Sequence, residues 1–284
     1  MKNIIKLLVL LPLFTMTACD DLFEPAIENN RDLDAMYSDP DYALGVLANG
    51  YILLPYNTSP TSDVATDDAV SNDNSNTWRA MATGAWTSQN DPASQWKNCY
   101  NAIQYLNLFL ERVESVPFSQ TENIQTMFVD SYSGEAYGLR AVYMYFLLRA
   151  HGGIGTDGQL LGVPIKTVSE SPESDFSQPR DTYAACIEQI LSDCDKAIEL
   201  LPLDYKDKHT ESEIPQKYLD LGINTDQYDR VNGVYRAGRI SGRIVEAVRA
   251  QAALMAASPA FAESGITWEE AANSAGTVLQ RIDG

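Results

Sequence analysis

The stretch that decides the fold of this chain is GEAYGLRAVYMYFLLRAHGG, residues 134–153. Glu135 lies near its start and Arg149 near its end, where a helix dipole favours an acidic and a basic side chain respectively. Gly152 and Gly153 supply a stop signal. The apolar side chains recur at steps of three and four, which places them on one face of a helix: Ala136, Leu139, Tyr143, Phe146, Leu147 and Ala150. We therefore predict an amphipathic helix here.

The same periodicity predicts further helices on both sides. They are expected at residues 32–54, 94–113, 181–201, 240–257 and 268–282, with a short helix near 124–132 leading towards the central one. Asp181 or Thr182 is the expected N-cap of the helix at 181–201. Between the helices, residues 155–179 are rich in Gly, Ser and Pro, with a short strand or an extended segment expected at 163–165. Residues 206–235 are polar and irregular. This pattern predicts an all-α fold with long loops.

The N-terminus has the features of a secretory signal peptide. Lys2 and Lys6 flank its start, a short apolar run follows, and Thr17 and Ala18 precede Cys19. The apolar run is well below the roughly 20 residues that a transmembrane helix needs. A Cys at this point is similar to the lipobox of bacterial lipoproteins, in which it carries the lipid. We expect residues 1–18 to be the signal peptide and Cys19 the lipidated residue of a protein held to the membrane by lipid alone.

Composition is that of an acidic globular protein. The chain has 20 basic and 39 acidic side chains and a hydrophobic fraction of 45%. Such a balance disfavours nucleic acid and anionic membrane surfaces as partners. Beyond Cys19, three cysteines remain: Cys99, Cys186 and Cys194. Cys186 and Cys194 lie eight positions apart on one predicted helix, which is too far for a disulfide. We expect buried free thiols and no metal site or cofactor.

Several segments resemble one family in their order along the chain. Besides residues 134–153, they are WKNCYNAIQYLNLFL at 96–110, GVPI at 162–165, RDTYAACIEQILSDCDKAIELLP at 180–202 and GRISGRIVEAVRAQAALMAASPAF at 238–261. Together these segments resemble the SusD/RagB family of nutrient-binding surface lipoproteins of Bacteroidota. The resemblance implies irregular helical hairpins of the tetratricopeptide type with long inserted loops, although no fixed period of about 34 residues is present.

The resemblance also implies a function and a location. The expected protein is lipid-anchored at the cell surface on the outer membrane, binds a glycan or other nutrient and delivers it to a SusC-type TonB-dependent transporter. Residues 19–284 would form the SusD-like helical domain. Members of the family are longer, so we expect this domain to be truncated, with the apolar side of its last helix uncovered.

The loop at residues 57–86 is the expected glycan site. It combines aromatic rings, which stack on the C–H faces of sugars, with polar side chains that bond hydroxyl groups. The candidate ligand-binding residues are Tyr56, Trp78, Trp86, Asp67, Asp68, Asn72 and Arg79, and Trp78 beside Arg79 is the leading pair. For Trp86, packing at the loop's return to the core is the better interpretation. Trp96 and Trp268 are expected in the core.

Enzymatic function finds little support in the sequence. GxSxG, HExxH and P-loop motifs are absent. His151 is explained by an interaction with the last carbonyls of its helix. Asp67 and Asp68 resemble the two catalytic carboxylates of a glycosidase only in residue type. Adjacent residues on one loop do not hold two carboxylates on either side of a glycosidic bond. An extracytoplasmic glycoside hydrolase and a purely structural surface lipoprotein remain the alternatives, as does calcium bound by the loop's oxygen ligands.

Overall fold

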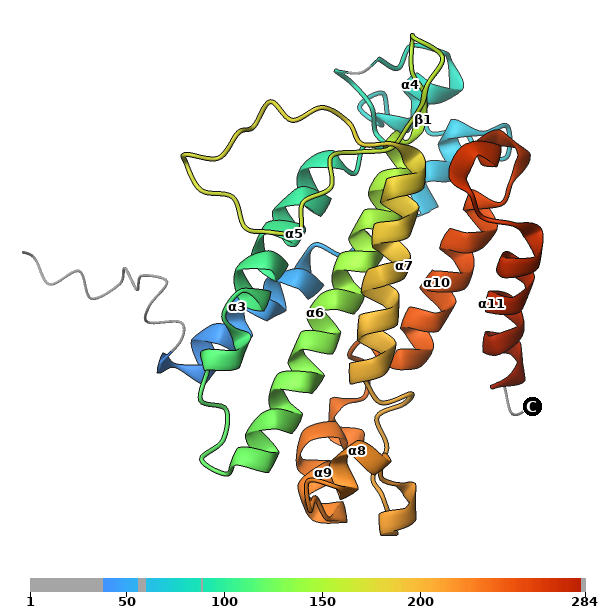
Figure 1. The fold of residues 1–284 in the computed structure, drawn as a ribbon. Coiled ribbons are helices and arrows are strands. Elements are labelled where there is room, and N and C mark those ends of the chain that lie inside the picture. Colours follow the sequence, from blue (N-terminus) through green and yellow to red (C-terminus); the bar gives the residue numbers. More distant parts are fainter. Residues whose placement is uncertain (1–37, 56–59, 88, 282–284) are drawn as a thin grey trace, which may run out of the picture.

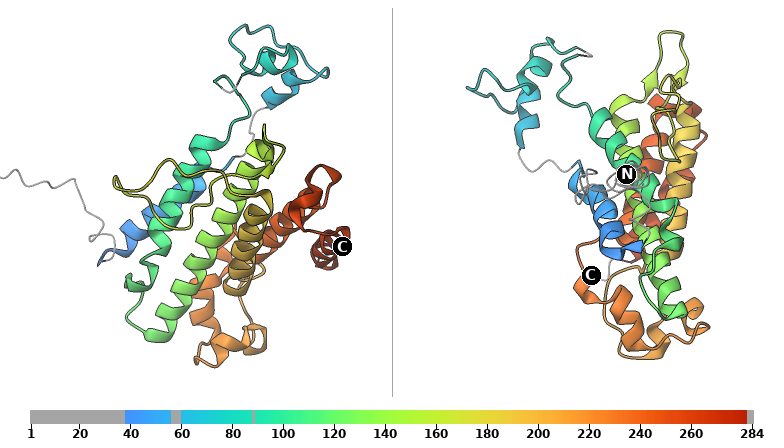
Figure 2. Two further views of the ribbon diagram at one scale, coloured as in Figure 1. Left: turned by 45° about the horizontal axis from the view of Figure 1, so that its top comes forward. Right: turned by 90° about the vertical axis from the view of Figure 1, so that its left-hand side faces the viewer.

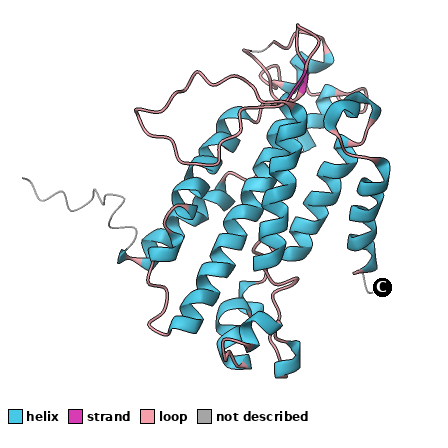
Figure 3. Ribbon diagram, viewed as in Figure 1, coloured by secondary structure: helices cyan, strands magenta, loops and turns pink. Residues whose placement is uncertain are grey.

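The fold is a layer of long helices joined by irregular segments (Figure 1). The computed structural model describes residues 38–55, 60–87 and 89–281. In these ranges the only strands are β1 (Gly153–Ile154) and β2 (Leu160–Leu161), which pair antiparallel with Gly153 opposite Leu161. Figure 3 shows how far helix predominates, and the predicted all-α class is confirmed.

The helices and short 3₁₀ turns, in chain order, are α3 (Pro40–Ile52), η1 (Pro60–Ala65), α4 (Trp78–Ala82), α5 (Trp96–Leu110), η2 (Val113–Ser115), α6 (Glu122–His151), α7 (Tyr183–Leu200), η3 (Glu211–Glu213), α8 (Gln216–Leu219), α9 (Thr225–Asn232), η4 (Val234–Arg236), α10 (Gly242–Ala256), η5 (Pro259–Ser264) and α11 (Trp268–Gln280).

Helix α6 is the centre of the layer. It has 30 residues and is therefore about 45 Å long at 1.5 Å per residue. It packs against α5 on one side and α7 on the other, with α10 and then α11 beyond α7 (Figure 1). Consecutive long helices pack against each other in the pairs α5–α6, α6–α7 and α10–α11. Among the described residues, no helix is both long enough and apolar enough to cross a membrane.

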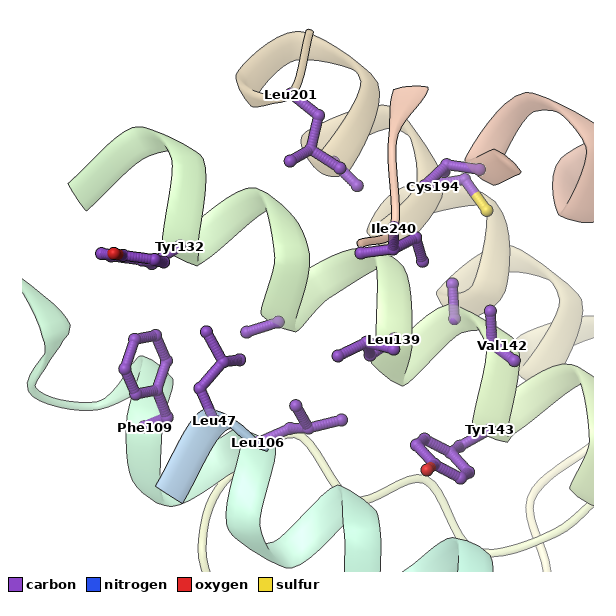
Figure 4. Packing of buried hydrophobic residues seen from close by; sticks show 14 of the residues in the cluster. Leu47, Leu106, Phe109, Tyr132, Leu139, Val142, Tyr143, Cys194, Leu201 and Ile240 are labelled. Atoms are coloured by element: carbon purple, nitrogen blue, oxygen red, sulfur yellow. The ribbon is translucent and has the colours of Figure 1, made fainter. Parts of the chain in front are cut away.

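The hydrophobic core lies along α6, between it and its neighbours (Figure 4). Leu139 and Tyr143 of α6 are buried with Leu106 of α5, and the hydroxyl of Tyr143 donates to the carbonyl oxygen of Gly50, 2.6 Å away. The three cysteines beyond Cys19 are free and buried, as predicted.

Two glycines allow the helices to approach α6 closely. A Cβ on Gly134 would lie 2.8 Å from Cγ of Leu201, and one on Gly138 would lie 2.9 Å from Cγ2 of Val245. Real Cβ atoms do not come this close to such neighbours, so any side chain here would push α7 or α10 outward.

Charged groups inside the layer join elements that are distant in sequence. Arg140 forms a bidentate pair with Asp193 of α7, with N–O distances of 2.7 and 2.8 Å. Glu135 is fully buried and pairs with Arg236 and Arg239. The dipole explanation of Glu135 is therefore wrong, because α6 begins at Glu122 and includes the predicted short helix, so that Glu135 lies in the helix interior.

Some predicted loops contain more structure than expected. Residues 206–235 include α8 and α9, because buried apolar side chains within this polar stretch anchor it to the core: Tyr218, Ile223, Tyr228 and Val231. The segment 57–86 includes η1 and α4. Residues 163–165 are not a strand, since side chains bond their backbone: the N–H of Ile165 donates to Asp181 (2.8 Å) and the carbonyl of Pro164 accepts from Tyr100 (2.7 Å).

The tryptophans are more exposed than predicted. Trp96 is 42% exposed, Trp268 57% and Trp86 51%, so none of the three is a core residue. Trp96 and Trp268 occupy the first positions of α5 and α11. A helical pattern predicts which face such a residue shares, but the first turn of a helix can extend beyond the neighbours that cover the rest of that face.

Candidate functional site

The candidate site is a cavity at the end of the layer where α5 begins and α6 ends. Figure 2 shows residues 60–87 standing away from the helices at this end. The cavity between them and the helices has a volume of about 540 Å³, within the range of about 300–1,000 Å³ typical of small-molecule sites. We call it the Trp78 cavity. It is lined by Leu53, Leu54, Pro55, Ser62, Trp78, Ala93, Gln95, Asn98, Phe146, Arg149 and Ala150.

Arg149 and Asn98 supply hydrogen-bonding groups to this cavity. The Arg149 guanidinium lies over the ring of Phe146, with 4.6 Å between its carbon and the ring centroid, and near the ring of Tyr145 at 5.7 Å. These cation–π contacts orient the guanidinium. Within the described residues, neither Arg149 nor Asn98 has a side-chain hydrogen bond or an ion pair. Their donors are therefore available to a ligand.

Trp78 is the predicted site residue that lines the cavity. It is the first residue of α4, and its backbone N–H donates to the side-chain oxygen of Asn76, 3.0 Å away. This bond closes the turn that begins the helix. The indole is half-buried and borders the cavity opposite the first turn of α5.

Arg79, its predicted companion, braces the loop. Its guanidinium donates to the side-chain oxygen of Asn74 (2.6 Å) and to the carbonyl oxygen of Asp73 (3.2 Å). Asp73 in turn accepts from the hydroxyl and the backbone N–H of Ser75, and these bonds hold the pKa of its carboxyl below the usual value. The bonds of Arg79 are thus directed into its own loop and away from the Trp78 cavity.

The other predicted residues lie elsewhere. Asp67, Asp68, Asn72 and Trp86 are exposed and do not line the cavity, so the structure does not bring them together with Trp78 there. Asp68 is bonded locally, its N–H donating to the hydroxyl of Thr66 at 3.2 Å. Two further predictions, Tyr56 in the site and lipidation at Cys19, fall outside the described residues.

His151 forms part of the wall beside the cavity. Its Nε2 accepts the backbone N–H of Gln95 at 3.0 Å, and its ring meets Trp96 edge-on with 5.4 Å between centroids. Burial and the nearby Arg180 lower the pKa of His151, whereas Asp91 raises it, and the net direction is downward. The neutral ring therefore joins the end of α6 to the start of α5, a different role from the one expected at its own helix end.

This arrangement is suited to binding a polar molecule that presents hydrogen-bond acceptors beside C–H groups. An aromatic ring and apolar side chains offer a surface for C–H groups, and Arg149, Asn98 and Gln95 offer hydrogen bonds. The lining contains no Asp or Glu. Within the described ranges, no group of three or more His, Cys, Asp and Glu side chains is placed to hold a metal ion, so calcium binding gains no support.

Sequence reasoning missed Arg149, Asn98 and Gln95 as site residues. Its position near the end of a helix explains Arg149 by the helix dipole alone, and the other two lie at the start of a helix whose apolar pattern indicates core packing. A signal for Arg149 was present, because Tyr145 and Phe146 precede it by four and three positions and place aromatic rings, not carboxylates, beside its guanidinium.

Comparisons with known proteins agree with this architecture. The model of a SusD-like family, described as starch-binding and associating with the outer membrane, matches residues 41–216. A curated SusD-like protein of Formosa agariphila is 31% identical over 104 residues, which cover 36% of this chain and 17% of the relative. A SusD-like protein of Bacteroides fragilis has a similar structure, with a TM-score of 0.63 at 17% identity over 88% of this chain and 39% of that one. A laminarin-binding SusD-like protein has a TM-score of 0.57 at 19% identity, over 87% of this chain and 44% of that one.

The structural matches cover most of this chain but only part of each related protein. The chain spans less than half the length of these relatives. The family model nevertheless covers well over half of this chain, including α5, the whole of α6 and α7. The signature helix at residues 134–153 and its neighbours are thus those of a known family, and the chain belongs to the SusD-like family.

Proposed function

We propose that the chain acts as a non-catalytic surface lipoprotein that captures an oligosaccharide in the Trp78 cavity. The carrying observation is the juxtaposition of the Trp78 ring with the unpaired donors of Arg149 and Asn98 in a cavity of about 540 Å³. A sugar ring would stack on the indole and accept hydrogen bonds through its hydroxyl groups. Membership of a family described as starch-binding and the likeness to a laminarin-binding protein support a glycan as the ligand.

The delivery role is part of the same proposal. The lipoprotein would be anchored through Cys19 on the outer membrane and would pass its ligand to a SusC-type TonB-dependent transporter. The description of the family as associating with the outer membrane supports this location. A gene for such a transporter immediately beside this one, and its co-purification with the tagged full chain, are the expected results. Absence of both would refute the delivery role and leave binding to be judged separately.

Substitution of Trp78 tests the binding role. Truncating a central aromatic residue of an interface commonly costs about 2 kcal/mol or more, so Trp78→Ala should weaken glycan affinity roughly thirtyfold. Arg149→Met keeps the apolar stem over Phe146 and removes the donors, and should weaken affinity roughly fivefold. The matched control is Trp268→Ala, which removes an exposed indole on α11 outside the cavity and should leave affinity unchanged.

Calorimetry against laminarin and starch oligosaccharides, with product analysis in parallel, is the measurement. Equal affinities for Trp78→Ala and Trp268→Ala would contradict the proposed site. Sugar released by the wild type but not by Asp68→Asn would move the protein to the glycoside hydrolase class. Binding of no glycan by the folded full chain would leave the structural alternative.

A further inference from the structure

The segment between β2 and α7, residues 162–180, is held against α5 by side chains of that helix. Asn107 donates to the carbonyl oxygens of Lys166 (3.2 Å) and Val168 (2.9 Å). Gln104 pairs with the backbone of Glu170 in both directions, at 2.9 and 2.8 Å. Figure 1 shows this segment reaching from the end of α6 across α5. Side chains from one face of α5 therefore hold the middle of this segment in place.

This docking creates a hollow between the segment and the first turns of α5. Its volume is about 210 Å³. We call it the Trp96 hollow, and define it by three rings and three polar side chains: Trp96, Tyr100, Phe176, Lys166, Glu170 and Gln178. The Tyr100 hydroxyl, which donates to the carbonyl of Pro164, fixes one wall. The ring of Trp96 packs at 4.9 Å on Tyr100 and edge-on against His151, yet it stays substantially exposed, as does Phe176.

We propose that the Trp96 hollow is a second saccharide site, which takes a single neutral pyranose unit. Trp96 and Phe176 offer aromatic surface to the C–H face of a sugar. Lys166 and Glu170 form an ion pair of 2.6 Å, so that the polar rim offers donors and acceptors at no net charge. This chemistry suits hydroxyl groups better than an ionic ligand. The volume is below the roughly 300 Å³ at which drug-sized sites begin, hence one sugar unit.

The Trp96 hollow adjoins the Trp78 cavity across the first turn of α5. Gln95 and Asn98 line the cavity, whereas Trp96 and Tyr100 line the hollow. His151 supports both sides, because it accepts from the N–H of Gln95 and packs against Trp96. The choice of a sugar as ligand rests on the function proposed above, but the hollow itself involves none of the residues that line the cavity.

Fluorine NMR of the full chain labelled with 5-fluorotryptophan tests the two sites separately. The four tryptophans, Trp78, Trp86, Trp96 and Trp268, are assigned by single Trp→Phe substitutions and titrated with glucose and with oligosaccharides of laminarin and starch. We expect the Trp78 and Trp96 signals to shift while that of Trp268 stays in place. In Phe176→Ala, the Trp96 response should need a sugar concentration about fivefold higher, with the Trp78 response unchanged. Phe176 is an exposed residue, so this variant should fold.

The outcomes separate the two proposals. A shift at Trp78 without one at Trp96 overturns the second site alone. A shift at Trp96 without one at Trp78 supports the hollow and contradicts the Trp78 cavity. If neither signal shifts, both proposals are overturned. The second site is also overturned if the Trp96 shift is unaltered in Phe176→Ala, or if the Trp268 signal shifts in the same way.

Discussion

Replacing Asp193 by Ala removes one half of a buried ion pair at the contact between α6 and α7. Both carboxylate oxygens of Asp193 accept from Arg140, and the two side chains are 0% and 4% exposed. In the variant, the guanidinium would keep its bond to the side-chain oxygen of Asn107 (2.8 Å) but would lose its counter-charge. Because both side chains are buried, bulk solvent does not replace the lost counter-charge, and most of the desolvation penalty of the guanidinium remains.

The size of the effect follows from burial. Removing one partner of a buried pair costs about 3–5 kcal/mol, a large part of the roughly 5–15 kcal/mol that stabilises a domain. A matched control lies two residues further along α7. Asp195 also pairs with an arginine of a neighbouring helix, Arg249 at 3.0 Å, but its side chain is 62% exposed. Asp195→Ala should therefore cost only about 0–1 kcal/mol.

Urea unfolding of both variants, followed by far-UV circular dichroism, measures the difference. We expect Asp193→Ala to unfold at a much lower urea concentration than the wild type with an unchanged m-value, and Asp195→Ala to unfold close to the wild type. If the two variants lose the same stability, burial does not decide the contribution of these pairs and the reasoning is refuted.

Three further predictions concern other parts of the chain. Cys19→Ala should abolish fatty-acid labelling and membrane attachment on fractionation, and a variant that remains acylated would contradict the lipobox interpretation. Folding lowers the pKa of His151 below its ordinary 6.5, so the stability that His151 contributes is present above pH 6.5 and is lost as the pH falls through the lower pKa of the folded state. The urea midpoint should therefore fall less steeply on acidification in His151→Gln than in the wild type. Gly138→Ala should cost about 1–3 kcal/mol by overpacking against α10, whereas Gly276→Ala, on α11 with nothing within 4 Å of its Cβ position, should be neutral or stabilising in the same unfolding assay.

The candidate site was only partly predictable. Trp78 stood out because an aromatic residue within an Asp- and Asn-rich loop has no core to pack into. Arg149 and Asn98 belong to different helices, and only the packing of α5 against α6 brings them to the same cavity. Arg79 was paired with Trp78 through adjacency in sequence, but adjacent helical side chains point in different directions, and its guanidinium bonds its own loop.

Local pattern determined the helices of this protein, because the spacing of apolar side chains and the caps act within a few residues. The central helix, the Thr182 cap of α7, which accepts from the N–H of Ala185, and the all-α class were all readable in this way. The tertiary structure decided what covers each helix face. Glu135 is buried because Arg236, 101 residues away, meets it, and Trp96 is exposed because its neighbours do not cover the first turn of α5. A periodic pattern specifies a face but not its partner, and burial depends on the partner.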